Sequence, residues 1–411
     1  MKNKVLFVSI AFPPKNDPEC IQAGRYLYYL QKKDAWEIIS VTSAIPTLFM
    51  PYDKSLEPYL GQVKRKVEIK VPENKYTNFL IRKINPHILE RPDSKFLFHL
   101  QWKKVTKSIK NIDIIYSRSF PLSSTIMAYK LKKRYNVPWV MHLSDPWCES
   151  PLSHYSNKSL AYHEKWEKLC FNEADIISFT TKRALELYAF KFPDLKHKFK
   201  VFPNVYDPNE IIIRNSLSES HTKANTLKIV YTGGLANTRT AEVFINALNL
   251  LSIQEQELLS KLEIIFAGDM DAYNRGLFEH NKLNFLNHVG VLTSKEANKL
   301  QMEADILLVI DSKIKDARKN VFFPSKLLDY AIKGKFILGI TEANSPTEEF
   351  IVKNNGIAFS FKDERAIADW IKKVLSDNSL IKGQKKIDRY FSAEEQSNEL
   401  SQLFKQLLDG K

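Results

Sequence analysis

The sequence has 411 residues, a length that favours two domains over one. Hydrophobic residues make up 44% of it and aromatic residues 12%, which is enough apolar material for packed cores and argues against disorder. No run of about 18 apolar residues occurs, so we predict no membrane-spanning helix. The three cysteines, Cys20, Cys148 and Cys170, are too few and too widely spaced for a disulfide framework, and no pair has metal-ligand spacing.

The net charge of +14 is unevenly distributed. Residues 1–205 hold 34 Lys and Arg against 19 Asp and Glu, whereas the remainder holds 27 against 28. The excess is densest in 61–110, with 13 basic and 4 acidic residues, among which apolar side chains such as Phe79, Leu80 and Ile84 are interleaved. This combination predicts contact with an anionic membrane surface. A solvated basic face and a groove for a soluble anionic acceptor are the alternatives. No recognition motif supports a nucleic-acid partner.

Short apolar strands alternate with amphipathic helices, a pattern that predicts parallel sheets with right-handed crossovers. In the first half we predict strands at 5–9, 37–41, 112–117, 139–142, 176–179 and 200–202, and helices at 22–31, 122–135, 158–173 and 181–190. The stretch 42–110 does not follow the alternation, and we interpret it as a basic, membrane-facing insertion.

A segment with two prolines, 202–208, and the polar residues after it predict a domain boundary. In the second half we predict strands at 228–231, 262–267, 285–289, 306–309, 336–340 and 357–361, and helices at 294–302, 325–332 and 393–408. The predicted fold is therefore α/β, with two doubly wound Rossmann-like domains, 1–205 and 206–380, that face a cleft. A helical segment, 381–411, follows. Ligands of such sheets bind outside the carboxyl ends of the strands.

The first strand of the second domain ends in VYTGGL, and Gly233 and Gly234 follow it. Glycines at such a turn let the backbone approach a phosphate, and the N-terminus of the next helix favours negative charge. Arg239, just before that helix, adds a formal positive charge. An ordinary strand-to-helix turn is the alternative interpretation.

The stretch FFPSKLLDYAIKGKF places Ser325 and Lys326 in the first turn of a helix that Pro324 opens. A lysine is disfavoured there by the helix dipole, but a bound diphosphate would reverse the penalty. Asp329, three residues later, lies on a similar face and can accept two ribose hydroxyls. A solvated lysine with an i,i+3 neighbour is the alternative.

The motif VMHLSDPW places His142 and Asp145 at the carboxyl end of a strand in the first domain. Histidine titrates near neutral pH, and the carboxylate can act as a base or orient one, so both are candidate catalytic residues. A core histidine and an Asp-Pro turn are the alternatives. Arg118, in Ser-Arg-Ser after another strand, is expected at the same rim.

The order strand–GG–helix, strand–AGD, HVGVL and PSKLLDYAIKGK resembles the donor domain of family-4-type (group 1) glycosyltransferases of the GT-B fold. The resemblance implies that Gly233, Gly234 and Lys326 contact a donor diphosphate and that Asp329 binds ribose or sugar hydroxyls. It implies that the backbone around Val291 reads the nucleobase. It also covers FPPKNDPECIQAGRYLYYL, which implies a position near the cleft for Gly24 and Arg25.

The family often has two glutamates eight positions apart; Asp329 can stand for the second, whereas Val321 occupies the place of the first. Arg318, Lys319 and Asn320 are candidate substitutes for the missing sugar contact.

The sequence therefore predicts a glycosyltransferase that moves a sugar from a nucleotide sugar to an acceptor. We expect a lipid-linked acceptor in cell-surface polysaccharide or glycoconjugate biosynthesis, and a cytoplasmic protein with peripheral contact to the inner face of the membrane. The resemblance implies a retaining reaction without a required metal, and no cofactor is predicted. A GT-B-fold sugar-nucleotide epimerase and a non-catalytic sugar-nucleotide-binding protein are the alternatives.

Overall fold

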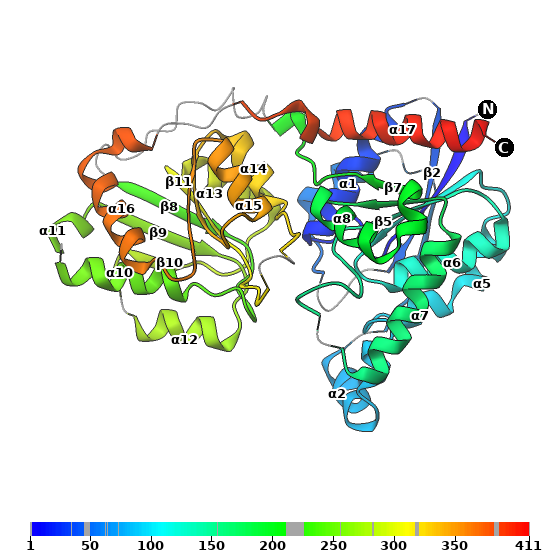
Figure 1. Ribbon diagram of the computed structural model, residues 1–411, viewed down its shortest axis with the longest axis horizontal. Helices are drawn as coiled ribbons and strands as arrows, with labels where there is room; N and C mark the ends of the chain where they lie inside the picture. The colour runs from blue at the N-terminus through cyan, green and yellow to red at the C-terminus, as the bar shows by residue number, and fades with distance from the viewer. Residues whose placement is uncertain are drawn as a thin grey trace. The chain divides into compact units, whose positions relative to one another are not determined.

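The computed structural model describes residues 2–33, 35–44, 50–61, 63, 65–72, 74–153, 155–210, 226–254, 256–281, 283–316, 320–381 and 386–410. The chain divides into two compact units (Figure 1). The first comprises Met1–Val205 with Arg389–Lys411, and the second comprises Tyr206–Asp388. Each unit is an α/β layer structure around its own parallel sheet, which confirms the predicted fold class.

In the part of the chain that the structure describes, the sheet of the first unit has seven parallel strands in the order β3-β2-β1-β4-β5-β6-β7. Their bounds are β1 Asn3–Val8, β2 Trp36–Ser43, β3 Arg65–Ile69, β4 Ile114–Ser119, β5 Trp139–Leu143, β6 Ile176–Phe179 and β7 Phe199–Val201. β1 is central, and its Val5 pairs with Ile38 on one side and Ile114 on the other. It reads as a continuous apolar run because helices cover both faces of the sheet.

Three helices of the first unit begin directly after a capping residue. Asp17, Ser156 and Thr181 each cap a helix by accepting a hydrogen bond from a backbone amide of its first turn. The bounds are α1 Pro18–Gln31, α2 Lys75–Ile84, α3 His87–Glu90, α4 Leu97–Leu100, α5 Trp102–Ser108, α6 Ser123–Tyr135, α7 Asn157–Glu173, α8 Lys182–Lys191 and α17 Ala393–Asp409. Short 3-10 turns span Lys54–Leu60, Pro193–Lys198 and Arg389–Phe391.

The last helix, α17, packs against α1 although it ends the chain (Figure 1). The Trp36 indole N–H donates to the Ser401 hydroxyl at 2.7 Å, and the Trp36 ring meets Phe404 edge-on with centroids 5.4 Å apart. The segment that we expected to follow the second domain thus contributes its helix to the core of the first unit.

The stretch 42–110 contributes to the sheet as well as to the surface. Its strand β3 pairs in parallel with β2, from Ile39 opposite Arg65 to Ser43 opposite Ile69. Of its apolar residues, Phe98 is buried in the core, whereas α2 extends outward as in Figure 1 and exposes a stripe of large side chains. The stripe consists of Tyr76, Phe79, Leu80 and Ile84, which are 84%, 57%, 57% and 83% exposed.

The sheet of the second unit, over the described residues, has six parallel strands in the order β10-β9-β8-β11-β12-β13. Their bounds are β8 Leu227–Thr232, β9 Leu262–Ala267, β10 Leu286–His288, β11 Ile306–Ile310, β12 Phe336–Ile340 and β13 Ile357–Phe359. The helices are α10 Glu242–Gln254, α11 Gln256–Leu259, α12 Ala272–His280, α13 Ser294–Glu303, α14 Lys326–Lys333, α15 Pro346–Lys353 and α16 Glu364–Ser376, with a 3-10 turn at Asn378–Leu380. Gly334 ends α14 with a φ of 66°, a left-handed conformation that glycine adopts readily.

Candidate functional site

Three turns meet at the carboxyl edge of the second unit's sheet, after β8, β9 and β10. The Gly233 amide donates to the Ala267 carbonyl at 2.7 Å, and the Gly268 amide donates to the Gly290 carbonyl at 2.8 Å. Gly268 has a φ of +140°, and a Cβ on it would lie 2.1 Å from the Gly233 oxygen. Only glycine permits this approach, so the turns form one continuous backbone surface.

Lys326, the first residue of α14, reaches under the first of these turns. Its Nζ donates to the Thr232 carbonyl at 2.7 Å and lies 4.3 Å from the centroid of the Tyr231 ring. A Cβ on Gly233 would fall 2.3 Å from this Nζ. The structure therefore brings together Lys326 and Gly233, two residues that are 93 positions apart in the sequence and that we predicted to share a diphosphate.

The charges around Lys326 are not balanced. Burial and the nearby Arg239 guanidinium lower the pKa of Lys326 to about 7, while Asp311 acts in the opposite direction. Within the described residues, the buried Nε of Arg239 has no hydrogen-bond partner. Two cationic side chains thus stand against one buried carboxylate, an arrangement that an anionic ligand would neutralise.

The remaining predicted donor residues lie around this centre. Gly234 is exposed, and a Cβ on it would meet only the Asp269 carbonyl, at 3.6 Å. Ser325 occupies the N-cap position of α14, and Asp329 lies one turn after Lys326 and is half-buried. Val291 is 66% exposed. It follows Gly290, whose carbonyl accepts the hydrogen bond from the Gly268 amide.

Of the three candidate substitutes for the missing glutamate, Arg318 and Lys319 lie outside the described residues. Asn320 is 2% exposed, which places it beneath the surface.

Several residues that hold the elements of this site together were not predicted from the sequence. Asp311 follows β11 and accepts a hydrogen bond from the Thr341 hydroxyl at 2.6 Å, and burial raises the pKa of its carboxyl. The Tyr330 hydroxyl accepts a hydrogen bond from the Thr232 amide at 3.0 Å, and Gln301 donates to the Thr232 hydroxyl at 2.9 Å. The only signal in the sequence was a polar residue directly after a buried strand, which is equally typical of a solvated loop.

In the first unit, His142 lies in the interior of the sheet. It is 1% exposed, and its Nδ1 lies 3.0 Å from the Ser178 hydroxyl. Burial and the Arg118 charge lower the pKa of His142 well below its ordinary value, so the imidazole is neutral. In this structure His142 is too deeply buried to contact an acceptor. Its position therefore favours the core-histidine interpretation over catalysis.

Arg118 is also buried and is fully engaged within the protein. Its Nε donates to Oε1 of Glu19 at 2.6 Å, its Nη1 donates to the Tyr116 hydroxyl at 3.2 Å, and its guanidinium lies 5.1 Å from the Tyr26 ring centroid. Burial opposes the charged form, but the Glu19 carboxylate keeps the pKa of Arg118 above its ordinary value. The guanidinium therefore links β4 to α1 and is not presented at the rim.

Asp145 differs from these two residues because its side chain is exposed. It follows β5, and the backbone on its amino side is held by a hydrogen bond from the Ser144 amide to the Ser119 carbonyl at 2.9 Å. Trp147, two residues later, is completely buried. Of the two predicted catalytic residues, Asp145 is the one that the structure presents to solvent.

Gly24 and Arg25 lie inside the packing of α1. A Cβ on Gly24 would come within 2.6 Å of Pro13 and 2.9 Å of Tyr59, so this glycine permits close packing of the helix. The Arg25 Nη1 donates to the Val205 carbonyl at 2.8 Å. Both residues therefore stabilise the fold of the first unit. Arg25 does so by binding Val205, the last residue before the chain enters the second unit.

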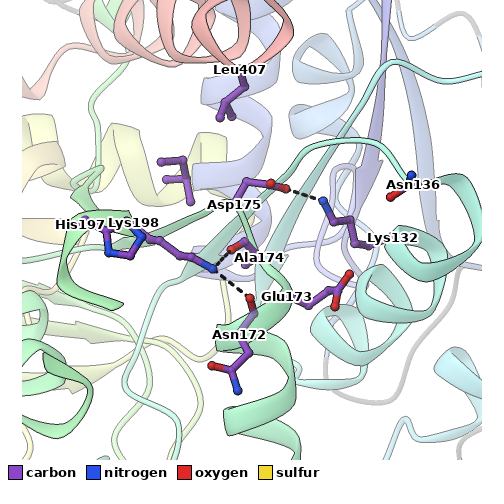
Figure 2. Close-up of a pocket in the computed structure, with 10 residues that line it drawn as sticks. Lys132, Asn136, Asn172, Glu173, Ala174, Asp175, His197, Lys198 and Leu407 are labelled. Atoms are coloured by element: carbon purple, nitrogen blue, oxygen red, sulfur yellow. Dashed lines mark hydrogen bonds and ion pairs between the residues drawn. The ribbon is translucent and has the colours of Figure 1, made fainter. Parts of the chain in front are cut away.

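A surface pocket of about 490 Å³ lies at the opposite, amino edge of the first unit's sheet (Figure 2). Two of its lysines are already paired: Lys132 contacts Asp175 at 2.6 Å, and the Lys198 ammonium donates to the Asn172 and Ala174 carbonyls, each at 2.9 Å. These lysines are therefore not available to a ligand, and the pocket lies at the amino edge of the sheet, whereas ligands of doubly wound sheets bind outside the carboxyl edge.

No three His, Cys, Asp or Glu side chains converge as a metal site within the described part of the chain. In that same part, no helix combines the length and apolar character needed to cross a bilayer.

No protein-family model and no curated protein matches this chain. Solved structures do. Sucrose-phosphate synthase from Thermosynechococcus elongatus is similar over 100% of both chains, with a TM-score of 0.68 and 14% identity. A trehalose-6-phosphate protein from E. coli, bound with UDP-2-fluoro glucose, covers 98% of this chain and 99% of its own, with a TM-score of 0.65 and 11% identity.

A protein from Listeria monocytogenes described as a UDP-N-acetylglucosamine 2-epimerase is also similar, over 100% of this chain and 98% of its own, with a TM-score of 0.60 and 11% identity. These likenesses establish the fold: the chain has the GT-B fold, which glycosyltransferases share with sugar-nucleotide epimerases.

Proposed function

We propose that this chain is a glycosyltransferase that takes a sugar from a nucleoside-diphosphate sugar bound by its second unit. The observation that carries the proposal is the position of Lys326 directly under the Gly233 turn, beside Arg239, at the carboxyl edge of a doubly wound sheet. Leaving-group charge on a diphosphate needs cationic and backbone N–H groups, and these residues supply them. The similar E. coli structure with bound UDP-2-fluoro glucose supports a uridine nucleotide as the first ligand to test.

Within this site, Ser325 and the Gly233–Gly234 backbone would contact phosphate oxygens, and Asp329 would accept ribose or sugar hydroxyls. On the resemblance to family-4-type enzymes, the backbone around Val291 would contact the base. The Gly290 carbonyl joins this turn to the other two by accepting a hydrogen bond from the Gly268 amide at 2.8 Å. A retaining reaction without a required metal is proposed on the resemblance to family-4-type enzymes. Product stereochemistry by NMR, and turnover in the presence of a chelator, test these two points.

For the acceptor side we propose that Asp145 acts as a base or orients one. It is the exposed carboxylate after β5, at the edge of the sheet where ligands of this fold class bind. The acceptor we propose is lipid-linked, and the enzyme takes it at an anionic membrane surface in the synthesis of a cell-surface polysaccharide or glycoconjugate. The exposed apolar stripe on α2 and the basic excess of 61–110 support this partner.

A screen of thermal shifts against UDP, GDP, ADP and CDP tests the donor assignment first. One nucleotide should raise Tm in proportion to the logarithm of its concentration, as linkage requires. Release of that nucleotide from its sugar conjugate, with and without a lipid-linked sugar acceptor, then separates transfer from epimerisation. Epimerisation is the second candidate because a similar solved structure is described as a UDP-N-acetylglucosamine 2-epimerase. Interconversion of the donor without any acceptor would establish it in place of transfer.

A further inference from the structure

Two helices, α7 and α8, hold the backbone on the carboxyl side of Asp145. The Tyr188 hydroxyl of α8 accepts a hydrogen bond from the Trp147 amide at 2.6 Å and donates one to Oε1 of Glu167 at 2.9 Å. The same carboxylate oxygen accepts a hydrogen bond from the Cys148 amide at 3.0 Å. The two consecutive loop amides, of Trp147 and Cys148, therefore donate their hydrogen bonds to the Tyr188 hydroxyl and the Glu167 carboxylate, which are themselves hydrogen-bonded to each other.

This pair is completely buried. Tyr188 and Glu167 are each 0% exposed, and Lys191 supplies the counter-charge with its Nζ 2.8 Å from Oε2 of Glu167. Burial and the Glu167 carboxylate raise the pKa of Tyr188 well above its ordinary value, so its hydroxyl stays protonated and keeps donating. Burying the Glu167 carboxylate carries a desolvation cost that an ordinary surface turn does not require, and the Lys191 side chain, 27% exposed, offsets part of it.

The loop is also fixed on the amino side of Asp145. The Ser144 hydroxyl donates to the Glu19 carboxylate, and the Ser144 carbonyl accepts a hydrogen bond from the Thr180 hydroxyl at 2.8 Å. Asp145 therefore lies between two anchored points while its own side chain is exposed. Groups that react must be held to within a fraction of an ångström, and buried second partners are the usual means.

We propose that Tyr188 is a positioning residue, which fixes the Asp145 carboxylate for the acceptor through its hydrogen bonds to the Trp147 amide and to Glu167. The inference rests on the proposed role of Asp145. Removing the hydroxyl frees the Trp147 amide and loosens the loop without touching the donor site. A misplacement of about 1 Å can cost on the order of 100-fold in rate, and loss of one anchor among several should cost about tenfold.

The test is Tyr188→Phe in the full chain, with Tyr135→Phe as the matched control. The Tyr135 hydroxyl likewise donates a hydrogen bond, to the Ile109 carbonyl at 2.8 Å, but Tyr135 lies on α6, away from the Asp145 loop. We expect kcat for transfer to a lipid-linked sugar acceptor, followed as UDP released from UDP-glucose or from the sugar nucleotide that the screen selects, to fall about tenfold in Tyr188→Phe. The Kd for UDP should stay within twofold, and Tyr135→Phe should keep its kcat. All rates are measured at a temperature well below the Tm of the wild-type protein and of both variants.

An unchanged kcat in Tyr188→Phe overturns the inference, as does an equal fall in Tyr135→Phe. If Tyr188→Phe does not fold, Glu167→Leu replaces it, because leucine removes the oxygen that accepts hydrogen bonds from both the Tyr188 hydroxyl and the Cys148 amide. An unchanged kcat in folded Glu167→Leu has the same consequence. Asp145→Ala separates the two levels. Near-normal turnover in that variant removes the role of Asp145 itself, whereas a loss there with normal Tyr188→Phe removes only the positioning role.

Discussion

Lys326 lies so close to Gly233 that a Cβ on the glycine would fall 2.3 Å from the lysine Nζ. Gly233 also has a φ of +135°, a conformation that residues with side chains rarely adopt. We therefore expect Gly233→Ala to displace the ammonium, lower Tm and weaken UDP binding by about 5- to 150-fold, which corresponds to strain of about 1–3 kcal/mol. Calorimetry and thermal unfolding measure both effects.

Gly234→Ala is the control for this prediction. A Cβ there would make an ordinary contact, 3.6 Å from the Asp269 carbonyl, so Tm should stay at the wild-type value. Equal loss of stability in the two variants would show that Lys326 does not restrict the turn.

Donor binding should weaken as the pH rises above 7. Lys326 has a pKa of about 7 in the empty site because of burial and the Arg239 charge, and a bound diphosphate favours the ammonium. Binding therefore takes up a proton between the pKa of the empty site and the higher pKa of the complex. The full affinity for the donor is present below pH 7. As the pH rises through that window, the Kd increases by up to about tenfold per pH unit.

Titration of UDP between pH 7 and pH 9 measures this slope, because its terminal phosphate, with a second pKa of about 6, is already ionised there. Lys326→Ala should bind weakly with no such slope. A steep slope that persists in Lys326→Ala would assign the proton to another group.

Asp145 and His142 should respond differently to substitution. Asp145→Ala removes an exposed carboxylate, so kcat should fall tenfold or more while Tm and UDP affinity stay unchanged. His142→Ala removes a side chain that is 1% exposed, so the free energy of unfolding should fall by about 1–3 kcal/mol. A lower kcat in folded His142→Ala at unchanged Tm would instead return the imidazole to the catalytic step.

Membrane contact should depend on the exposed stripe of α2. Replacing Phe79 and Ile84 by Ser leaves the core intact, since these side chains are 57% and 83% exposed. We expect the protein to sediment with anionic vesicles at low salt, to be released by high salt, and to bind several-fold less after this replacement. No sedimentation of the unaltered protein at low salt would rule out the membrane as its partner.

Charge reversal tests whether the basic residues act locally. Lys103, Lys104 and Lys107 are exposed on α5, and replacing all three by Glu should abolish vesicle binding. The same number of reversals at exposed lysines elsewhere in the first unit, Lys182, Lys196 and Lys200, changes the net charge equally and should leave most of the binding. Equal loss in both variants would mean that only net charge matters.

Most of the sheet was predictable because parallel strands buried on both faces appear as apolar runs. Strands β9 and β12 have the predicted bounds, 262–267 and 336–340. β3 was not predicted because three of its five residues are charged, Arg65, Lys66 and Glu68, as suits an edge strand.

The site was only half predictable, for a physical reason. The sequence placed Lys326 at a helix start and glycines after a strand, and the fold brings them together. It did not show which polar residues near strand ends would be buried. His142, Arg118 and Asp145 are all such residues, yet other elements of the fold bury the first two. Burial depends on contacts such as that between Arg118 and Glu19, 99 positions away, which no local pattern encodes.

The most direct test of the donor site is calorimetric titration of UDP into the wild-type protein and into Lys326→Ala at pH 6.5. The control is Lys373→Ala, an exposed lysine on α16 of the same unit. A charged hydrogen bond contributes about 1.5–3 kcal/mol, so the Kd of Lys326→Ala should rise by about 10- to 150-fold while Lys373→Ala stays at the wild-type value. An unchanged Kd in Lys326→Ala, with binding retained, would contradict the assignment of the donor diphosphate to Lys326 and the Gly233 turn.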